Sequence, residues 1–304
     1  MKKFLSILLI FVLILSLSGC GADTGKNPDN GGDNTKGVND GTDDGKNDDT
    51  NDSEDESVTI TEQVLIDQDG IKVTATELDE ETLFGSEIKL IVENSTQTNI
   101  TVQARDVSIN NLMIDSTLSC DVAAGMKAND SIVFMSSDLE ASAIDKIAIV
   151  ELRLHIFDTD TWDTILDTDP IVINTSVSES YTQSYDDSGE LIFEGEGIRV
   201  ISKGLNTENE IMGPSIQLYI ENNSEDGITI QSRNVSVNGF MVEPAFSCEV
   251  SPGKKAFEGI HFLNLDDNGI SQIDTAQFYL TIFNTDTWDT IIDTDPITLN
   301  FTQE

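Results

Sequence analysis

The sequence predicts an all-β fold that occurs twice, as two tandem β-sandwich domains behind a disordered acidic tether. Apolar and polar residues alternate over short stretches, and the same order of strands and turns returns after 126 to 128 residues. Because that period is too long for the stacked units of a solenoid, we expect each copy to be a domain with its own core.

The N-terminus has the pattern of a secretion signal. A basic start precedes an apolar run over residues 4–17, which is too short to span a bilayer. The run ends in LSGC at residues 17–20, which resembles the lipobox of bacterial lipoproteins. By that resemblance residues 1–19 are a lipoprotein signal peptide, and Cys20 carries the lipid that anchors the mature chain in the membrane. An ordinary signal peptide with an incidental cysteine is the alternative.

Residues 20–57 are predicted to be a disordered acidic linker. From 21 to 57 the chain has twelve acids, three lysines and Val38 as its only large aliphatic residue, so it has nothing to bury. The whole chain has a formal net charge of −40. That charge predicts solubility and self-repulsion, and it argues against binding to nucleic acid.

The two copies are expected at residues 58–176 and 186–304, joined by an interdomain linker at 177–185. Within each copy short alternating runs predict strands, as at 87–93, and Asn-rich turns at 110–111 and 238–239 predict hairpins. Further turns are expected at 124–127 and 252–255, and a helical turn near 137–144.

One irregularity occurs in both copies. The apolar phase changes from even to odd positions between Val102 and Val107, and again between Ile230 and Val235. Since a one-residue slip would turn half of the apolar groups to water, a β-bulge or a crossover between sheets is expected near Arg105 and Arg233.

The count of about seven or eight strands in each copy favours an immunoglobulin-like sandwich. Together with the lipobox, the acidic tether and the PGKK turn at 252–255, it resembles uncharacterised Ig-like repeat domains of Gram-positive lipoproteins. The first copy departs from that pattern because Ala124 stands in place of the proline. The resemblance implies a fold and an extracytoplasmic location on the outer face of the cell membrane, and no activity.

The residue inventory argues against an enzyme. The two histidines, His155 and His261, occupy non-equivalent positions, and no nucleophile motif, phosphate loop or zinc spacing accompanies them. Cys120 and Cys248 share the phase of apolar neighbours, so they are expected to be buried free thiols.

The most repeated segment is acidic. FDTDTWDTILDTDPI at 157–171 returns as FNTDTWDTIIDTDPI at 283–297, identical at thirteen of fifteen positions. The spacing does not fit an EF-hand, because Trp162 stands at position 5 of the loop, where an oxygen ligand is needed. We expect a structural turn, capped by Asp160 and Asp163, and no bound cofactor, with a calcium site as the alternative. The calcium candidates are Asp158, Asp160, Asp163, Asp167, Asp169, Asp286, Asp289, Asp293 and Asp295.

Four further residues are candidates for binding. Trp162 and Trp288 are expected to cover the open edge of a core, with a stacking platform for sugar as the alternative. Arg105 and Arg233 are expected to pair with carboxylates of their own domain, with an anionic ligand as the alternative.

The function expected from the sequence is that of a surface-anchored, non-catalytic lipoprotein for adhesion, scaffolding or ligand binding. Its expected partners are the membrane, through the Cys20 lipid, and a protein or glycan of the cell envelope. A calcium-dependent carbohydrate-binding lipoprotein or a transporter-associated binding lipoprotein is the alternative.

Overall fold

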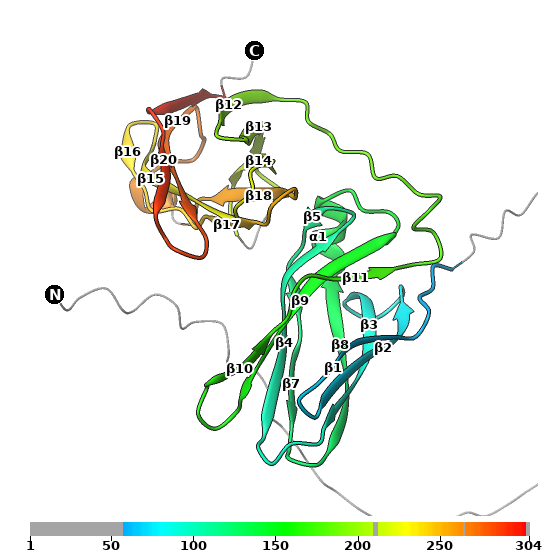
Figure 1. Ribbon diagram of the computed structural model, residues 1–304. Coiled ribbons are helices and arrows are strands. Elements are labelled where there is room, and N and C mark those ends of the chain that lie inside the picture. Colours follow the sequence, from blue (N-terminus) through cyan, green and yellow to red (C-terminus); the bar gives the residue numbers. More distant parts are fainter. Residues whose placement is uncertain (1–56, 209–211, 264, 302–304) are drawn as a thin grey trace, which may run out of the picture. The chain divides into compact units, whose positions relative to one another are not determined.

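The computed structural model describes residues 57–208, 212–263 and 265–301. The expected signal peptide, the lipidated Cys20 and all but the last residue of the acidic linker lie outside these residues. Residues from Glu54 to Glu304 form one compact unit, and nearly all of its regular structure is β-strand, as predicted (Figure 1). In the described part of the chain no helix is long and apolar enough to cross a membrane.

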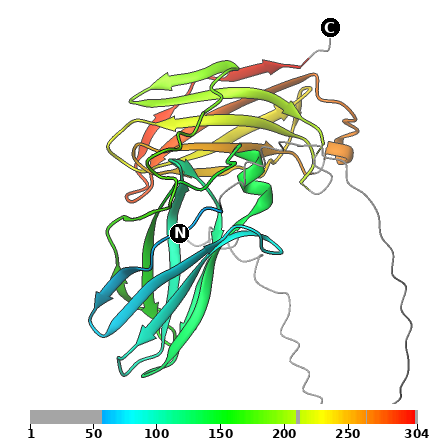
Figure 2. The ribbon, with the colours of Figure 1, turned by 90° about the vertical axis from the view of Figure 1, so that its right-hand side faces the viewer.

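Repeat 1, residues 58–176, contains two sheets whose long strands run side by side (Figure 2). One sheet has the order β1-β2-β3-β8-β6, and the other has β10-β9-β4-β5, with β7 on β4 and β11 on β9. The elements are β1 (Gln63–Gln68), β2 (Ile71–Asp79), β3 (Gly85–Asn94), β4 (Ile100–Ile109), β5 (Leu112–Met113), β6 (Ser116–Thr117), β7 (Ser119–Val122), β8 (Lys127–Met135), α1 (Ser136–Ala141), β9 (Ile149–Asp158), β10 (Thr164–Asp167) and β11 (Ile171–Asn174).

Repeat 2, residues 186–304, has the corresponding strands in the corresponding order, except that an isolated bridge between Ala245 and His261 stands in place of β6. The path β18-β14-β13-β12 continues from β5 of repeat 1, and the other sheet is β16-β15-β19-β20, with β17 on β15 and β21 on β19. The elements are β12 (Glu190–Gly195), β13 (Ile198–Asn206), β14 (Ser215–Asn222), β15 (Ile228–Val237), β16 (Phe240–Met241), β17 (Ser247–Val250), β18 (Lys255–His261), the 3-10 turn η1 (Leu265–Asn268), β19 (Thr275–Asn284), β20 (Thr290–Asp293) and β21 (Ile297–Asn300).

Each repeat encloses its own hydrophobic core between its two sheets. In repeat 1 the alternating apolar side chains of β3 and β9 meet there, and in repeat 2 those of β14 and β19. Charged neighbours on the same strands point the other way, which is the outcome that the period-two pattern predicts.

The predicted turns and bulges are present. The hairpin residues Asn110 and Asn111 have φ of 51° and 66°, and Asn238 has 51°. The pairing of β4 with β9 shifts register between Arg105 and Ser108, and β15 with β19 shifts between Arg233 and Ser236. The predicted bulges are therefore confirmed in both repeats, and α1 confirms the helical turn.

Two asparagines, all of them buried except the half-buried Asn238, hold the loops of each repeat in the same way. Asn94 Nδ2 donates to the carbonyls of residues 98 and 122 at 2.8 and 2.9 Å, and its Oδ1 accepts the N–H of residue 96 at 2.9 Å. Asn222 repeats this arrangement with residues 226, 250 and 224. Likewise Asn110 and Asn238 each donate to one loop carbonyl and accept two backbone N–H groups.

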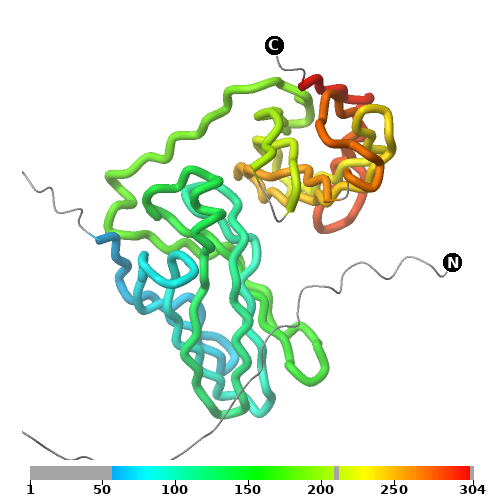
Figure 3. Tube along the Cα trace, turned by 180° about the vertical axis from the view of Figure 1, so that it is seen from behind, coloured from blue at the N-terminus to red at the C-terminus, as the bar shows by residue number. Residues whose placement is uncertain are grey.

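The segment predicted as a linker, residues 177–185, lies against repeat 1. Gln183 is buried and donates to Ala143 O at 2.9 Å, and the hydroxyl of Tyr185 donates to Asn110 O at 2.6 Å. Figure 3 shows the chain continuing from this segment into repeat 2. Side-chain hydrogen bonds therefore fix a stretch whose composition alone predicts only a connection.

Candidate functional site

The acidic repeat forms the tip between β9 and β10, and again between β19 and β20. We call residues 157–167 and 283–293 the tryptophan hairpins; the first projects from repeat 1 (Figures 1 and 3). Asp158 Oδ1 accepts the backbone N–H of residues 160 and 161 at 2.9 and 3.0 Å. Asn284 Oδ1 accepts those of residues 286 and 287, both at 3.0 Å. The Asp-to-Asn difference between the copies keeps the bonds, since both side chains offer the same oxygen.

Each tip presents its tryptophan to solvent. Trp162 is 74% exposed and Trp288 is 59% exposed. Both have positive φ, 66° and 60°, a conformation that is costly for a side chain of this size. The prediction that these rings cover a core edge is therefore wrong, because both lie outside the core.

A phenylalanine backs each exposed ring. The ring of Trp162 stacks on Phe157, with centroids 5.3 Å apart and planes 16° from parallel. Trp288 lies 6.1 Å from Phe283 with a 48° tilt. Phe157 is buried although it lies outside the core cluster of repeat 1, and it supports one face of the tryptophan. One face of the indole rests on the protein while the other remains open to a ligand.

An aspartate ties the base of each hairpin. Asp167 Oδ1 lies 2.5 Å from Nδ1 of His155 on the neighbouring strand. In repeat 2, Asp293 accepts the hydroxyl of Thr281 at 2.9 Å and forms an ion pair with Arg233. The prediction that Arg233 pairs with a carboxylate of its own domain is confirmed.

A register shift in β10 decides which of its residues reach the core. Ile165 is exposed, whereas Leu166 packs against the core, because the pairing of β10 with β9 shifts register between Thr164 and Leu166. That shift turns Asp167 toward His155, which gives it a partner that the sequence pattern did not indicate.

The calcium candidates are spread along the hairpins. Asp158 caps the turn in place of the expected Asp160 and Asp163, and Asp160 accepts the side-chain N–H of Asn99 at 3.3 Å. Within residues 57–208, 212–263 and 265–301, no group of three or more His, Cys, Asp or Glu side chains is placed to hold a metal ion. Local hydrogen bonding accounts for part of the repeated acid, namely Asp158, Asp160, Asp167 and Asp293.

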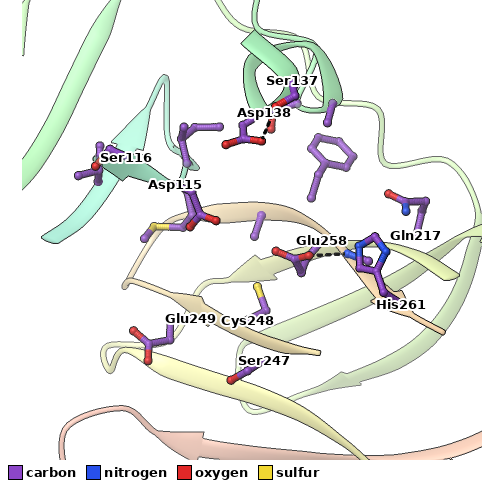
Figure 4. Close-up of a pocket in the computed structure, with 18 of the residues that line it drawn as sticks. Asp115, Ser116, Ser137, Asp138, Gln217, Ser247, Cys248, Glu249, Glu258 and His261 are labelled. Carbon is purple, nitrogen blue, oxygen red and sulfur yellow. Dashed lines mark hydrogen bonds between the residues drawn. The ribbon is translucent and has the colours of Figure 1, made fainter. Parts of the chain in front are cut away.

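A separate cavity of about 820 Å³ lies in the same compact unit, lined by α1, the β5–β6 segment and parts of β17 and β18 (Figure 4). Five carboxylates line it, from Asp106, Asp115, Asp138, Glu249 and Glu258. Arg105 lines it as well, so the two equivalent arginines have different surroundings. Nothing in the sequence pattern indicated this cavity, because its lining comes from segments far apart along the chain.

Burial favours the neutral forms of the groups in the cavity. It raises the pKa of Asp138, Glu249 and Glu258. It lowers the pKa of His261, whose Nδ1 is buried without a hydrogen-bond partner among the described residues. Such groups suit hydrogen bonding to a neutral ligand better than nucleophilic chemistry.

Both described cysteines are buried free thiols, as predicted. Burial raises the pKa of Cys120 to about 12, and it raises the pKa of Cys248 as well. A reactive cysteine needs a lowered pKa, so these thiols are packing residues.

No protein-family model and no curated protein matches the chain. Among solved structures, the YadV chaperone is similar over 71% of this chain and 92% of its own, at 12% identity and a TM-score of 0.23. A structure of Salmonella enterica SafA pilin in complex with the SafB chaperone is similar over 71% of this chain and 89% of the matched chain, at 12% identity and a TM-score of 0.20. A protein of unknown function from Porphyromonas gingivalis W83 is similar over 70% of this chain and 89% of its own, at 11% identity and a TM-score of 0.18. Likenesses this distant carry no argument about function.

Proposed function

We propose that this chain is a membrane-anchored, non-catalytic lipoprotein whose two Ig-like domains bind a cell-envelope partner through the tryptophan hairpins. The anchor is the lipid on Cys20, by the resemblance of residues 17–20 to a lipobox. The acidic stretch before repeat 1 holds the two domains away from the membrane on the extracytoplasmic side.

The Ig-like assignment is supported by the order of the strands. Each repeat has two antiparallel sheets around one core, with short hairpin connections and alternating strands. In this assignment the hairpins β9–β10 and β19–β20 are loops of the sandwich, which is where domains of this class place their binding residues.

One observation carries the binding function: Trp162 and Trp288 are exposed at equivalent tips. A large apolar ring left mostly in solvent gains little from packing in its own domain, and a positive φ at such a residue adds strain. Both features occur twice in a chain whose only tryptophans are these two. A ligand surface that the ring covers explains the exposure and the repetition together.

The surroundings of the ring indicate the class of ligand. Asp160 and Asp163 flank Trp162 with carboxylate oxygens that accept hydrogen bonds from hydroxyl groups. The net charge of −40 disfavours anionic polymers. A neutral glycan offers flat C–H faces to the indole and hydroxyls to the aspartates, so we assign the site to neutral polysaccharide of the cell envelope.

Co-sedimentation with insoluble envelope polysaccharide tests this assignment on the chain from residue 54 onward. Trp162→Ala and Trp288→Ala should each weaken binding, and the double variant should abolish it, because two linked sites gain by avidity. Phe84→Ala, which removes an exposed aromatic ring elsewhere in repeat 1, is the matched control and should bind normally. Undiminished binding by the double variant would reject the tryptophan hairpins as the site.

The anchor has its own test on the complete chain. Cys20→Ser should release the protein from the membrane fraction into the soluble fraction, because it removes the lipid attachment. A variant that stays in the membrane fraction with unchanged mass contradicts the lipoprotein assignment and leaves the glycan site standing.

A further inference from the structure

A turn of repeat 1 is covered by a loop of repeat 2. The ammonium group of Lys254 lies 3.0 Å from Glu151 Oε2 and 3.2 Å from Asn111 Oδ1. The backbone N–H of Lys255 donates to Asn111 O at 2.9 Å, and Lys255 pairs with Leu112 in parallel register. Leu112 is fully buried as a result, and Lys254 is 8% exposed.

The equivalent turn of repeat 2 is open. Gly239 stands where repeat 1 has Asn111, and Phe240 stands where it has Leu112. Phe240 is 51% exposed and the following Met241 is 65% exposed. The position that is buried in repeat 1 therefore presents an aromatic ring to solvent in repeat 2.

The equivalent loop of repeat 1 is open as well. Met126 stands where repeat 2 has Lys254, and it is 60% exposed. The carboxylate partner has changed at the same time, since Gln277 stands where repeat 1 has Glu151. The open surfaces have thus lost the charge of the covered contact on both sides, while the loop gains an apolar side chain at Met126 and the turn keeps apolar side chains at Phe240 and Met241.

The backbone that carries these side chains is the same in the covered and the open versions. The hairpin residues Asn110 and Asn238 both have φ of 51°, and the loop glycines Gly125 and Gly253 have φ of 73° and 72°. The loop of repeat 1 and the turn of repeat 2 therefore have the backbone shapes of the pair that is in contact.

We propose that the turn at 239–241 of one molecule binds the loop at 124–127 of a second copy of this chain. The contact repeats between molecules the one that repeat 2 makes with repeat 1, with Met126 against Phe240 and Met241 in place of the ion pair. Such a contact joins two different surfaces, so it extends head to tail instead of closing as a symmetric dimer.

Electrostatics sets the conditions under which the assembly forms. Each chain carries a formal net charge of −40, so two copies repel at low ionic strength. Salt screens that repulsion and leaves the apolar contact in place. Association should therefore increase with salt, opposite to the behaviour of a contact held by ion pairs.

Sedimentation velocity of the chain from residue 54 onward, over a series of protein and salt concentrations, tests the proposal. The wild type should form dimers and longer species, and their share should increase with protein concentration and with salt concentration. Phe240→Asp and Met126→Asp should each reduce association at least tenfold, because each places a carboxylate in the apolar contact. Leu83→Asp changes an exposed apolar residue away from both surfaces and should associate like the wild type.

A mixing experiment distinguishes this contact from a symmetric one. Phe240→Asp protein keeps an intact loop and Met126→Asp protein keeps an intact turn, so an equimolar mixture should form dimers that do not extend further. A wild type that stays monomeric at every salt concentration, or a mixture that forms no dimer, would overturn the proposal.

Discussion

Repeat 1 and repeat 2 are most alike in the hydrogen bonds that shape their loops, and they differ at the turn where repeat 1 meets repeat 2. Asn94 and Asn222 make the same bonds, and the two hairpin tips are capped alike even where Asp158 is exchanged for Asn284. The turns at 110–113 and 238–241 share a backbone and carry different side chains. Among the residues that the structure describes, only the first turn is covered by another part of the chain, so its residues reflect that neighbour.

The largest expected effect comes from the buried asparagines that the copies share. Asn222→Ala leaves two carbonyls and one N–H group without their partner, so unfolding should become easier by about 3 kcal/mol. Asn94→Ala should cost repeat 1 a similar amount. Urea unfolding measures both, with the exposed Asn223→Ala as control. If one of the two variants loses less than about 0.5 kcal/mol of stability, the two asparagines are not equivalent.

A smaller effect is expected at the contact between the repeats. Glu151→Gln leaves Lys254 buried without a carboxylate and should cost about 2 kcal/mol. Lys254→Met should cost less, because Glu151 retains access to water. The double variant carries the residue types of the open surfaces and should be less destabilised than the sum of the single variants. Additive losses in a double-mutant cycle would show that the two side chains are not coupled.

The tryptophans should matter little for stability. Trp162→Ala removes an exposed ring and should change the free energy of unfolding by about 1 kcal/mol or less. Melting curves in calcium and in magnesium at equal ionic strength should coincide, because backbone capping holds the turn. A rise of several degrees in calcium only, abolished by Asp160→Asn, would make the hairpin a metal site.

The smallest effect concerns pH and has no counterpart in repeat 1. Burial raises the pKa of Glu258 above its ordinary value of 4.5. Its stabilising contribution is therefore present below the unfolded pKa and lost as pH rises through the folded pKa. The Glu258→Gln variant should lose less stability as pH rises, and it should be slightly more stable than the wild type at neutral pH. Parallel stability profiles for variant and wild type between about pH 4 and 8 would contradict the shift.

Much of the fold follows from local pattern, because alternation, Asn-rich turns and a phase change each have a local cause. The bulge near Arg105 and the burial of Cys120 are of this kind. Trp162 was misplaced because alternation specifies the face of a residue within a sheet, and the hairpin tip lies beyond the sheet. The register shift at Thr164 hid the partner of Asp167. The cavity depends on packing between distant segments, and no local pattern reports that.

Intrinsic fluorescence tests the central claim most directly, because the only two tryptophans of the chain are the proposed contacts. Titration with soluble neutral envelope polysaccharide should shift the emission to shorter wavelength as the exposed indoles leave water. Trp162→Phe and Trp288→Phe should each retain the shift from the remaining ring, and chelator should leave it unchanged. Saturable binding with no change in emission would contradict the account, since it would place the ligand away from both hairpins.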